Sequence, residues 1–261
     1  MYVTLHNILS DKTGGDIFVC FGAWHFFYIF LAIAAITLSL YFTRNKCQKD
    51  KNRLLNILIS IAFGLYMLDF FLMPFAYGEI DIEKLPFHSC TSMCIMCFVS
   101  RVCGALKKYR QNFALLALIS NLVYLLYPAG VMWYQIHPLS YRVIQTLLFH
   151  AIMVVYCLLS LLLDSDGLKI KEWYRNLVIL CSLTIWAIIG NALYSGTLDE
   201  LDYNKSFNWF FVKNDPFYAI PSDISPYVMP FINITAFLAV EIMFCLIITE
   251  IRKLKFFKKR F

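Results

Sequence analysis

Charged residues are scarce in this chain. They make up 15% of its 261 residues, whereas hydrophobic residues make up 60%. A soluble domain is typically about 25% charged, so this composition excludes an ordinary soluble protein and is typical of one embedded in a membrane. Long polar segments that could form a second domain are also lacking. We therefore expect a single domain over residues 1–261.

Three further absences narrow the class of protein. The nine cysteines lie mostly inside apolar runs, and none are paired in polar connections, so no disulfide framework is predicted. The residues before position 17 lack the basic start of a cleavable signal peptide, so the first apolar run is expected to stay in the membrane. No lysine occurs between Lys213 and Lys253, which excludes a retinal Schiff base in the last span.

What the chain does contain is seven long apolar runs. Each is long enough for a helix to cross a hydrocarbon core about 30 Å thick. Because unpaired backbone groups are not tolerated in lipid, the runs must be helical. The runs cover residues 17–42, 54–77, 86–106, 112–133, 141–163, 174–194 and 226–251. The predicted fold is an all-α polytopic membrane protein with seven transmembrane helices.

The basic residues indicate the orientation of these helices. In a seven-helix topology, 18 of the 23 Lys and Arg residues fall on one side, including six in the segment 252–260. The positive-inside rule then predicts an outer N-terminus and a cytoplasmic C-terminus. Basic residues placed in this way are explained by topology and by anionic lipid, so a nucleic-acid partner is not expected. The usage of Lys, Asn and Ile suggests a bacterial plasma membrane.

Polar side chains inside the spans gather towards the predicted outer side. At about 1.5 Å of rise per residue, they lie within about 13 Å of the outer helix ends. The group comprises His25, Asp69, His88, Cys90, His150, Asn191 and Asn233. The inner half contains fewer polar side chains, namely Arg101, which can snorkel, and Glu241. Because intramembrane polar groups are costly and usually functional, we expect an outer-half polar site.

Cys90 is the candidate nucleophile of this site. It follows Pro86, a residue suited to a first helical turn, so it lies where unpaired amides and the helix dipole favour a thiolate. A thiolate with an imidazole in reach, here His150, is the minimum for nucleophilic acyl transfer. Cys94 and Cys97 lie deeper on the same face and are expected to pack. Zinc bound by His88, Cys90 and His150 is an alternative, as is haem between paired histidines, but neither has a discriminating motif, so no metal or other cofactor is predicted.

The connection 195–225 is unusually long and combines acidic with aromatic residues. A structureless loop of this length typically acts as a lid or a binding loop. Its aromatic residues could equally lie at the level of the lipid headgroups. The sequence leaves both interpretations open.

The order of short motifs along the chain resembles a known family. The motifs are Trp24-His25, Leu85-Pro86-Phe87-His88-Ser89-Cys90, Asn121, Tyr127-Pro128, Phe149-His150 and Asn191. Together they are similar to YwaF-like integral membrane proteins, a group related to eukaryotic transmembrane protein 164. The resemblance implies a seven-helix fold. For the eukaryotic relatives it also implies a cysteine-dependent acyltransferase acting on phospholipids, with catalytic residues at the positions of Cys90 and His150. In the family a Gly lies close to an Asn-aromatic stretch, whereas here an acidic segment separates Gly196 from Asn208, which leaves the role of Asn208 open.

These observations lead to one principal hypothesis and one alternative. The first is a membrane-embedded acyltransferase that moves an acyl chain between phospholipids and lysophospholipids through a thioester on Cys90, with His150 as base. His88, Asp69 or Asn191 would orient the imidazole or hold the oxyanion, and His25, Asn121 and Asn208 complete the predicted substrate-binding set. The alternative is a non-enzymatic membrane subunit that captures or transports a small molecule in the same pocket, although no inverted repeat supports a transporter.

Overall fold

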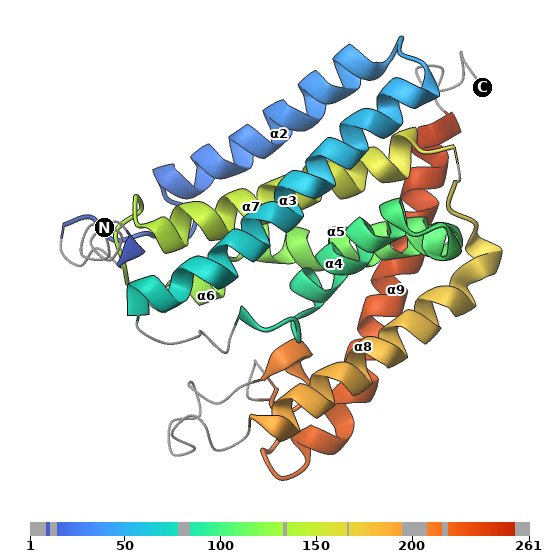
Figure 1. Ribbon diagram of the computed structural model, residues 1–261. Coiled ribbons are helices and arrows are strands. Elements are labelled where there is room, and N and C mark those ends of the chain that lie inside the picture. The colour runs from blue at the N-terminus through green and yellow to red at the C-terminus, as the bar shows by residue number, and fades with distance from the viewer. Residues whose placement is uncertain are drawn as a thin grey trace.

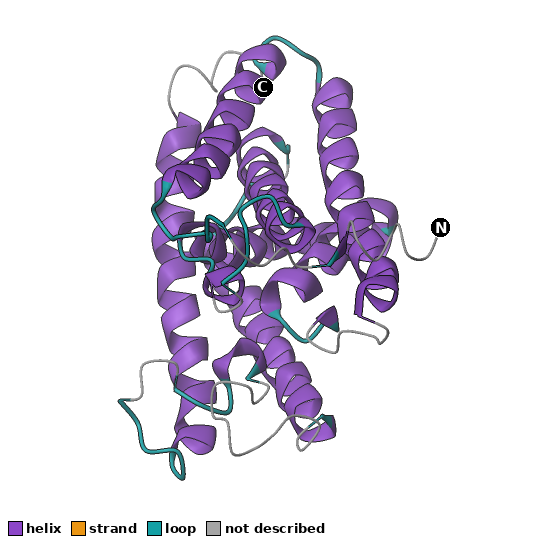
Figure 2. Cartoon of the chain, turned by 90° about the vertical axis from the view of Figure 1, so that its left-hand side faces the viewer, coloured by secondary structure: helices purple, strands orange, loops and turns teal. Residues whose placement is uncertain are grey.

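Helices account for the regular structure of the described part of the chain. The computed structural model describes residues 9–10, 15–77, 84–132, 135–165, 167–194, 208–215 and 219–253, and within these ranges there is no strand (Figure 2). The long helices are α2 (Ala23–Thr43), α3 (Gln48–Tyr77), α4 (Ser89–Val102), α5 (Arg110–Leu126), α7 (Tyr141–Leu163), α8 (Trp173–Leu193) and α9 (Ser225–Lys253). Short turns of helix join them: η2 (Gly104–Tyr109), α6 (Ala129–Met132), η3 (Ile170–Glu172) and η4 (Trp209–Phe211).

Five of the described helices are long and apolar enough to cross a membrane. They are α2, residues Gln48–Leu72 of α3, α7, α8 and α9, while α4 is apolar but has only 14 residues. The prediction of an all-α, multi-pass membrane protein is thereby confirmed. Seven complete crossings and the outward position of the N-terminus stay predictions.

Helices α5 and α7 form the centre of the bundle. Every residue of α5 from Gln111 to Asn121 is buried, and 83% of the apolar window of α7 is buried, against 17% for α2 and for α9. Figure 1 shows α2 and α3 on one side of this pair and α8 and α9 on the other, in agreement with the helix contacts. The outer helices carry large exposed apolar side chains such as Phe30 and Phe231, as expected of surfaces that face lipid.

Two of the predicted spans, the third and the fourth, end earlier than the sequence indicates. The third ends at Val102, because Cys103 takes an extended conformation (φ −100°, ψ 113°) and the chain continues as η2. The fourth ends at Leu126, because Pro128 disfavours the helical conformation at Tyr127 (φ −139°, ψ 82°). The chain resumes as the single turn α6.

An ionic cluster fixes the helices at the predicted cytoplasmic end. The side chain of Arg101 is 3% exposed, so this residue does not snorkel. Instead it donates hydrogen bonds to Asp164 Oδ2 and Ser160 Oγ, both at 2.9 Å, and so joins α4 to the end of α7. Arg252 of α9 donates to the carbonyl oxygens of Leu161 and Asp164, each at 3.0 Å. Arg101 and Asp164 compensate each other's buried charge, and the cluster links three helices.

Candidate functional site

Cys90 lies in the first turn of α4. His88 occupies the N-cap position with an extended backbone (φ −74°, ψ 144°), so the helix begins at Ser89. First-turn amides have no partner within their own helix. The Cys90 thiol at this helix start is free and partly buried.

The start of α4 is held against α8. Pro86 O accepts a hydrogen bond of 2.7 Å from Trp186 Nε1 of α8. The Phe87 ring packs 4.8 Å from the ring of Trp186 and 4.8 Å from that of Trp209. Gly190 makes this packing possible, because a Cβ at that position would overlap the Phe87 ring. The position of Cys90 therefore depends on contacts with α8 and with the turn around Trp209.

His150 lies on the central pair of helices and has a defined orientation. Its ring is stacked on that of Tyr124, with centroids 4.0 Å apart, and is 4% exposed. Asn121 Nδ2 donates to Ala117 O at 2.7 Å, which turns the amide oxygen of Asn121 towards the imidazole. His150 Nδ1 donates to that oxygen at 2.8 Å. Nδ1 then carries the proton of the neutral ring, and Nε2, which has no hydrogen-bond partner among the described residues, is the nitrogen able to accept one.

Lys84 brings a positive charge to the site. Its Nζ lies 2.9 Å from Oδ2 of the buried Asp69, and its carbonyl oxygen accepts a hydrogen bond of 2.9 Å from Tyr66. In the sequence, Lys84 is one of the five basic residues that fall on the predicted outer side. The signal that could have found it was its position directly before Leu85-Pro86.

The Cys90 sulfur and the His150 imidazole are not bonded to each other. Across the described residues no hydrogen bond joins Cys90 Sγ to His150. Helix α4 packs on α5, which packs on α7, so the two side chains come from connected parts of one core. Their direct contact stays a prediction.

This arrangement was compared with known proteins. The model of the TMEM164 family matches residues 20–249, which is most of the chain. The chain belongs to the TMEM164 family. The relation to transmembrane protein 164 expected from the sequence motifs is thereby confirmed. A search of curated proteins and a search of solved structures each found no match.

Not every polar residue predicted for the site of this TMEM164-family protein is directed into it. His25 is fully buried and uses both ring nitrogens on the backbone. Its Nε2 donates to Leu125 O at 2.7 Å, and its Nδ1 accepts from the amide of Phe21 at 2.9 Å. These bonds fasten the start of α2 to the end of α5, a geometry that favours a packing role over substrate binding.

Two asparagines, Asn191 at the end of α8 and Asn208 after it, hold a turn in place through hydrogen bonds to its backbone. Asn191 bonds both backbone groups of Trp209, through Nδ2 to the carbonyl at 3.3 Å and through Oδ1 to the amide at 3.1 Å. Asn208 Oδ1 accepts from the amides of Lys213 (3.0 Å) and Asn214 (3.1 Å). These bonds place the Trp209 ring against Phe87 and beside His88, at a centroid distance of 6.4 Å from His88. The two asparagines thus shape the wall of the site through Trp209.

The lid interpretation of the long connection concerns residues 195–207 and 216–218, which lie outside the described residues. Within the described part of the chain, no three His, Cys, Asp or Glu side chains are grouped as metal ligands. The zinc alternative built on His88, Cys90 and His150 therefore has no geometric support there.

Proposed function

We propose that this protein is a membrane-embedded acyltransferase that exchanges fatty acyl chains between phospholipids and lysophospholipids. The observation that carries the proposal is the His150–Asn121 pair, because it leaves Nε2 as a proton acceptor in the core that also carries Cys90. A histidine oriented by an asparagine and combined with a cysteine is a recurrent acyl-transfer arrangement. Membership of the TMEM164 family is compatible with a membrane enzyme.

The first half of the reaction transfers the acyl chain to the protein. The Cys90 proton passes to His150 Nε2, and the sulfur attacks the carbonyl carbon of a phospholipid ester. The tetrahedral intermediate collapses as the carbon–oxygen ester bond breaks. His150 returns its proton to the departing alkoxide, so a lysophospholipid leaves and an acyl thioester remains on Cys90.

The second half reverses these steps with another acceptor. The hydroxyl of a second lysophospholipid gives its proton to His150 Nε2 and attacks the thioester carbonyl. The carbon–sulfur bond breaks, and the sulfur recovers a proton from the imidazolium. Water as the acceptor would make the same site a lipid hydrolase, and product analysis separates the two outcomes.

The charge of Lys84 suits a lipid substrate. In this proposal the Lys84 ammonium, which is paired with Asp69, stabilises the oxyanion of the intermediate or holds the phosphate of the headgroup. Asn121 would act as a positioning residue, because it touches the imidazole rather than the lipid. In this proposal the protein works in a cell membrane, with Cys90 towards the extracytoplasmic leaflet.

The decisive experiment is acyl transfer from a labelled phospholipid to a lysophospholipid by purified protein in lipid nanodiscs. We expect Cys90→Ala and His150→Ala to abolish transfer. Cys103→Ala, a substitution of an exposed cysteine on the same segment, should leave it intact. The wild-type protein should also yield a hydroxylamine-sensitive acyl group on the peptide that contains Cys90. Full activity of Cys90→Ala would exclude the covalent mechanism.

A further inference from the structure

The turn η4, which carries Trp209, has a backbone conformation that costs free energy. Phe210 and Phe211 both have positive φ angles, of 56° and 51°, in the left-handed region. A residue with a Cβ is disfavoured there, so two such residues in succession need support from the surrounding structure. The Phe210 ring is buried and packs on Phe237 of α9, with centroids 5.0 Å apart, whereas the Phe211 side chain is 47% exposed. Burial supports Phe210, and Phe211 needs a different support.

Asn233 of α9 provides this support through the backbone of the turn. Its Nδ2 donates hydrogen bonds to the carbonyl oxygens of Phe210, at 2.8 Å, and Phe211, at 2.9 Å. An asparagine amide carries two hydrogens, so both bonds can form at once. On the opposite side, Asn191 of α8 bonds the amide and the carbonyl of Trp209. Side-chain amides from α8 and α9 therefore hold the turn between the two helices.

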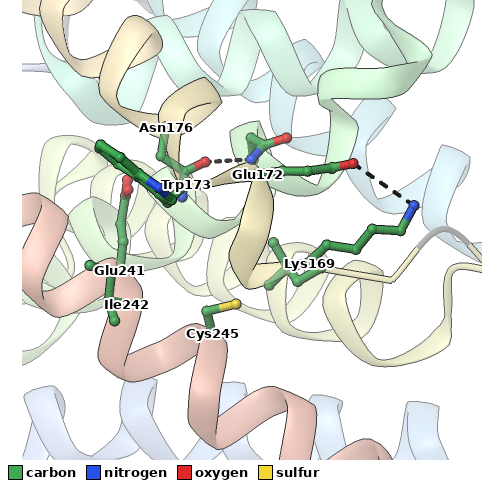
Figure 3. Close-up of a pocket in the computed structure, with 9 residues that line it drawn as sticks. Lys169, Glu172, Trp173, Asn176, Glu241, Ile242 and Cys245 are labelled. Carbon is green, nitrogen blue, oxygen red and sulfur yellow. Dashed lines mark hydrogen bonds and ion pairs between the residues drawn. The ribbon is translucent and has the colours of Figure 1, made fainter.

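Helix α9 can act as a support because it is fixed to the bundle beyond Asn233. Glu241, eight residues and about 12 Å further along the helix, is buried and faces Asn176 of α8 across a small cavity (Figure 3). Asn176 Oδ1 in turn accepts a hydrogen bond from Asn112 of α5. Near the end of α9, Arg252 donates to two carbonyl oxygens at the end of α7. The bundle therefore sets the position of Asn233 independently of the turn.

We propose that Asn233 is a positioning residue for Cys90. Asn233 holds the turn, and the turn places the Trp209 ring 4.8 Å from the ring of Phe87. Phe87 lies directly before the N-cap of α4, the helix whose first turn contains Cys90. Without the Asn233 amide, the turn would relax from its left-handed conformation and Trp209 would no longer hold the start of α4. The effect on catalysis rests on the proposed acyl transfer, whereas the effect on the position of Cys90 does not.

The test measures alkylation of Cys90 by N-ethylmaleimide in nanodiscs, with mass spectrometry of the peptide that contains it. Asn233→Leu keeps the approximate volume of the side chain and removes both donor hydrogens. We expect alkylation about 5- to 150-fold faster, the factor by which loss of two hydrogen bonds raises a local opening equilibrium. The exposed Cys103 should react at the same rate in both proteins. The matched control, Thr235→Ala, changes an exposed polar residue of α9 and should keep the wild-type rate at Cys90.

A second background tests the contribution of backbone strain. Phe211→Gly removes the steric cost of a positive φ, because glycine has no Cβ. In this background, Asn233→Leu should accelerate alkylation of Cys90 by a smaller factor than it does in the chain with Phe211. Equal factors in the two backgrounds would show that Asn233 does not oppose strain at Phe211, and would overturn this part of the inference.

Acyl transfer provides the functional measurement. In Asn233→Leu, kcat should fall about 10- to 100-fold with little change in KM, because a nucleophile misplaced by about 1 Å can lose a factor of that order. If the wild-type protein transfers no acyl chain, the proposed function fails, and alkylation still decides whether Asn233 positions Cys90.

Two results of the alkylation experiment would overturn the inference. One is a wild-type rate at Cys90 in Asn233→Leu, and the other is equal acceleration at Cys90 and Cys103, which would indicate general loosening of the fold. If Asn233→Leu does not fold, Phe237→Leu removes the ring of α9 that packs on Phe210 and should give the same selective acceleration. A wild-type rate at Cys90 in Phe237→Leu would then show that α9 does not support the turn.

Discussion

The hydrogen bond between Asn121 and His150 offers the sharpest test of the proposed chemistry. Asn121→Ala removes the acceptor of the Nδ1 proton and leaves the imidazole in place on the Tyr124 ring. Without that acceptor, the neutral ring is free to carry its proton on either nitrogen. The form with the proton on Nε2 cannot act as a base. The orientation of the imidazolium that forms during the reaction is also lost.

The expected fall in kcat follows from the strength of the hydrogen bond between Asn121 and His150. The ring becomes charged in the transition state, and a hydrogen bond to a charged group contributes about 1.5–3 kcal/mol. Since each 1.36 kcal/mol changes a rate tenfold, kcat should fall about 10- to 150-fold. KM should change little, because Asn121 contacts the ring and not the lipid. This separation of kcat from KM distinguishes a positioning role from a general loss of structure.

The assay is acyl transfer in nanodiscs at a temperature where both proteins are folded. The matched control is Ser120→Ala, one residue earlier on α5. Among the described residues, Ser120 Oγ bonds only the carbonyl oxygens of Leu116 and Ala117 in its own helix, so this variant should stay within about twofold of wild type. Wild-type kcat in Asn121→Ala would refute the assignment of His150 Nε2 as the base.

Two further predictions concern the surroundings of Cys90. Lys84→Met leaves the Asp69 carboxylate buried without its partner and should lower the free energy of unfolding by about 3 kcal/mol. In the double variant Lys84→Met with Asp69→Asn, thermal denaturation should show that stability recovers. Acyl transfer should not recover, and recovery of both would argue against a role for the ammonium in the reaction. Gly190→Ala places a methyl group in the Phe87 ring and should cost about 1–3 kcal/mol, measured by the same denaturation assay. Gly64→Ala, where nothing lies within 4 Å of the added carbon, should be neutral or stabilising, and equal losses in the two variants would contradict this packing.

Hydropathy predicted where the chain is helical but not always where a helix ends. The fifth run coincides with α7, because a buried apolar helix in a membrane needs an uninterrupted apolar segment. The early end of α5 had a visible cause in Pro128. The early end of α4 did not, since Cys103 is an ordinary residue within an apolar stretch and its extended conformation has no local signal. Apolar character alone cannot distinguish a continuing helix from a turn buried against its neighbours.

Depth along a helix predicted which polar residues lie at one level, but not which of them face each other. One residue of an α-helix turns the side chain by about 100°, so two residues at equal depth can point in unrelated directions. His25 and His150 were predicted at similar depths. Both ring nitrogens of His25 form hydrogen bonds with backbone groups of α5 and the N-terminal segment, whereas Nε2 of His150 has no partner among the described residues. For the same reason the residue that orients the imidazole is Asn121, which the sequence analysis assigned to substrate binding.

The two halves of the proposed site belong to different parts of the bundle. His150 is fixed on the central helices by Asn121 and Tyr124. The start of α4, with Cys90, is fixed by Trp186 of α8 and by the Trp209 turn. Catalytic hydrogen bonds are often long in a free enzyme and tighten only when the substrate is bound. In the proposed reaction, binding of a lipid ester between these two parts of the bundle would therefore have to bring the sulfur and the imidazole closer together. The packing of α8 against α4 is then as important to the reaction as the two reacting side chains.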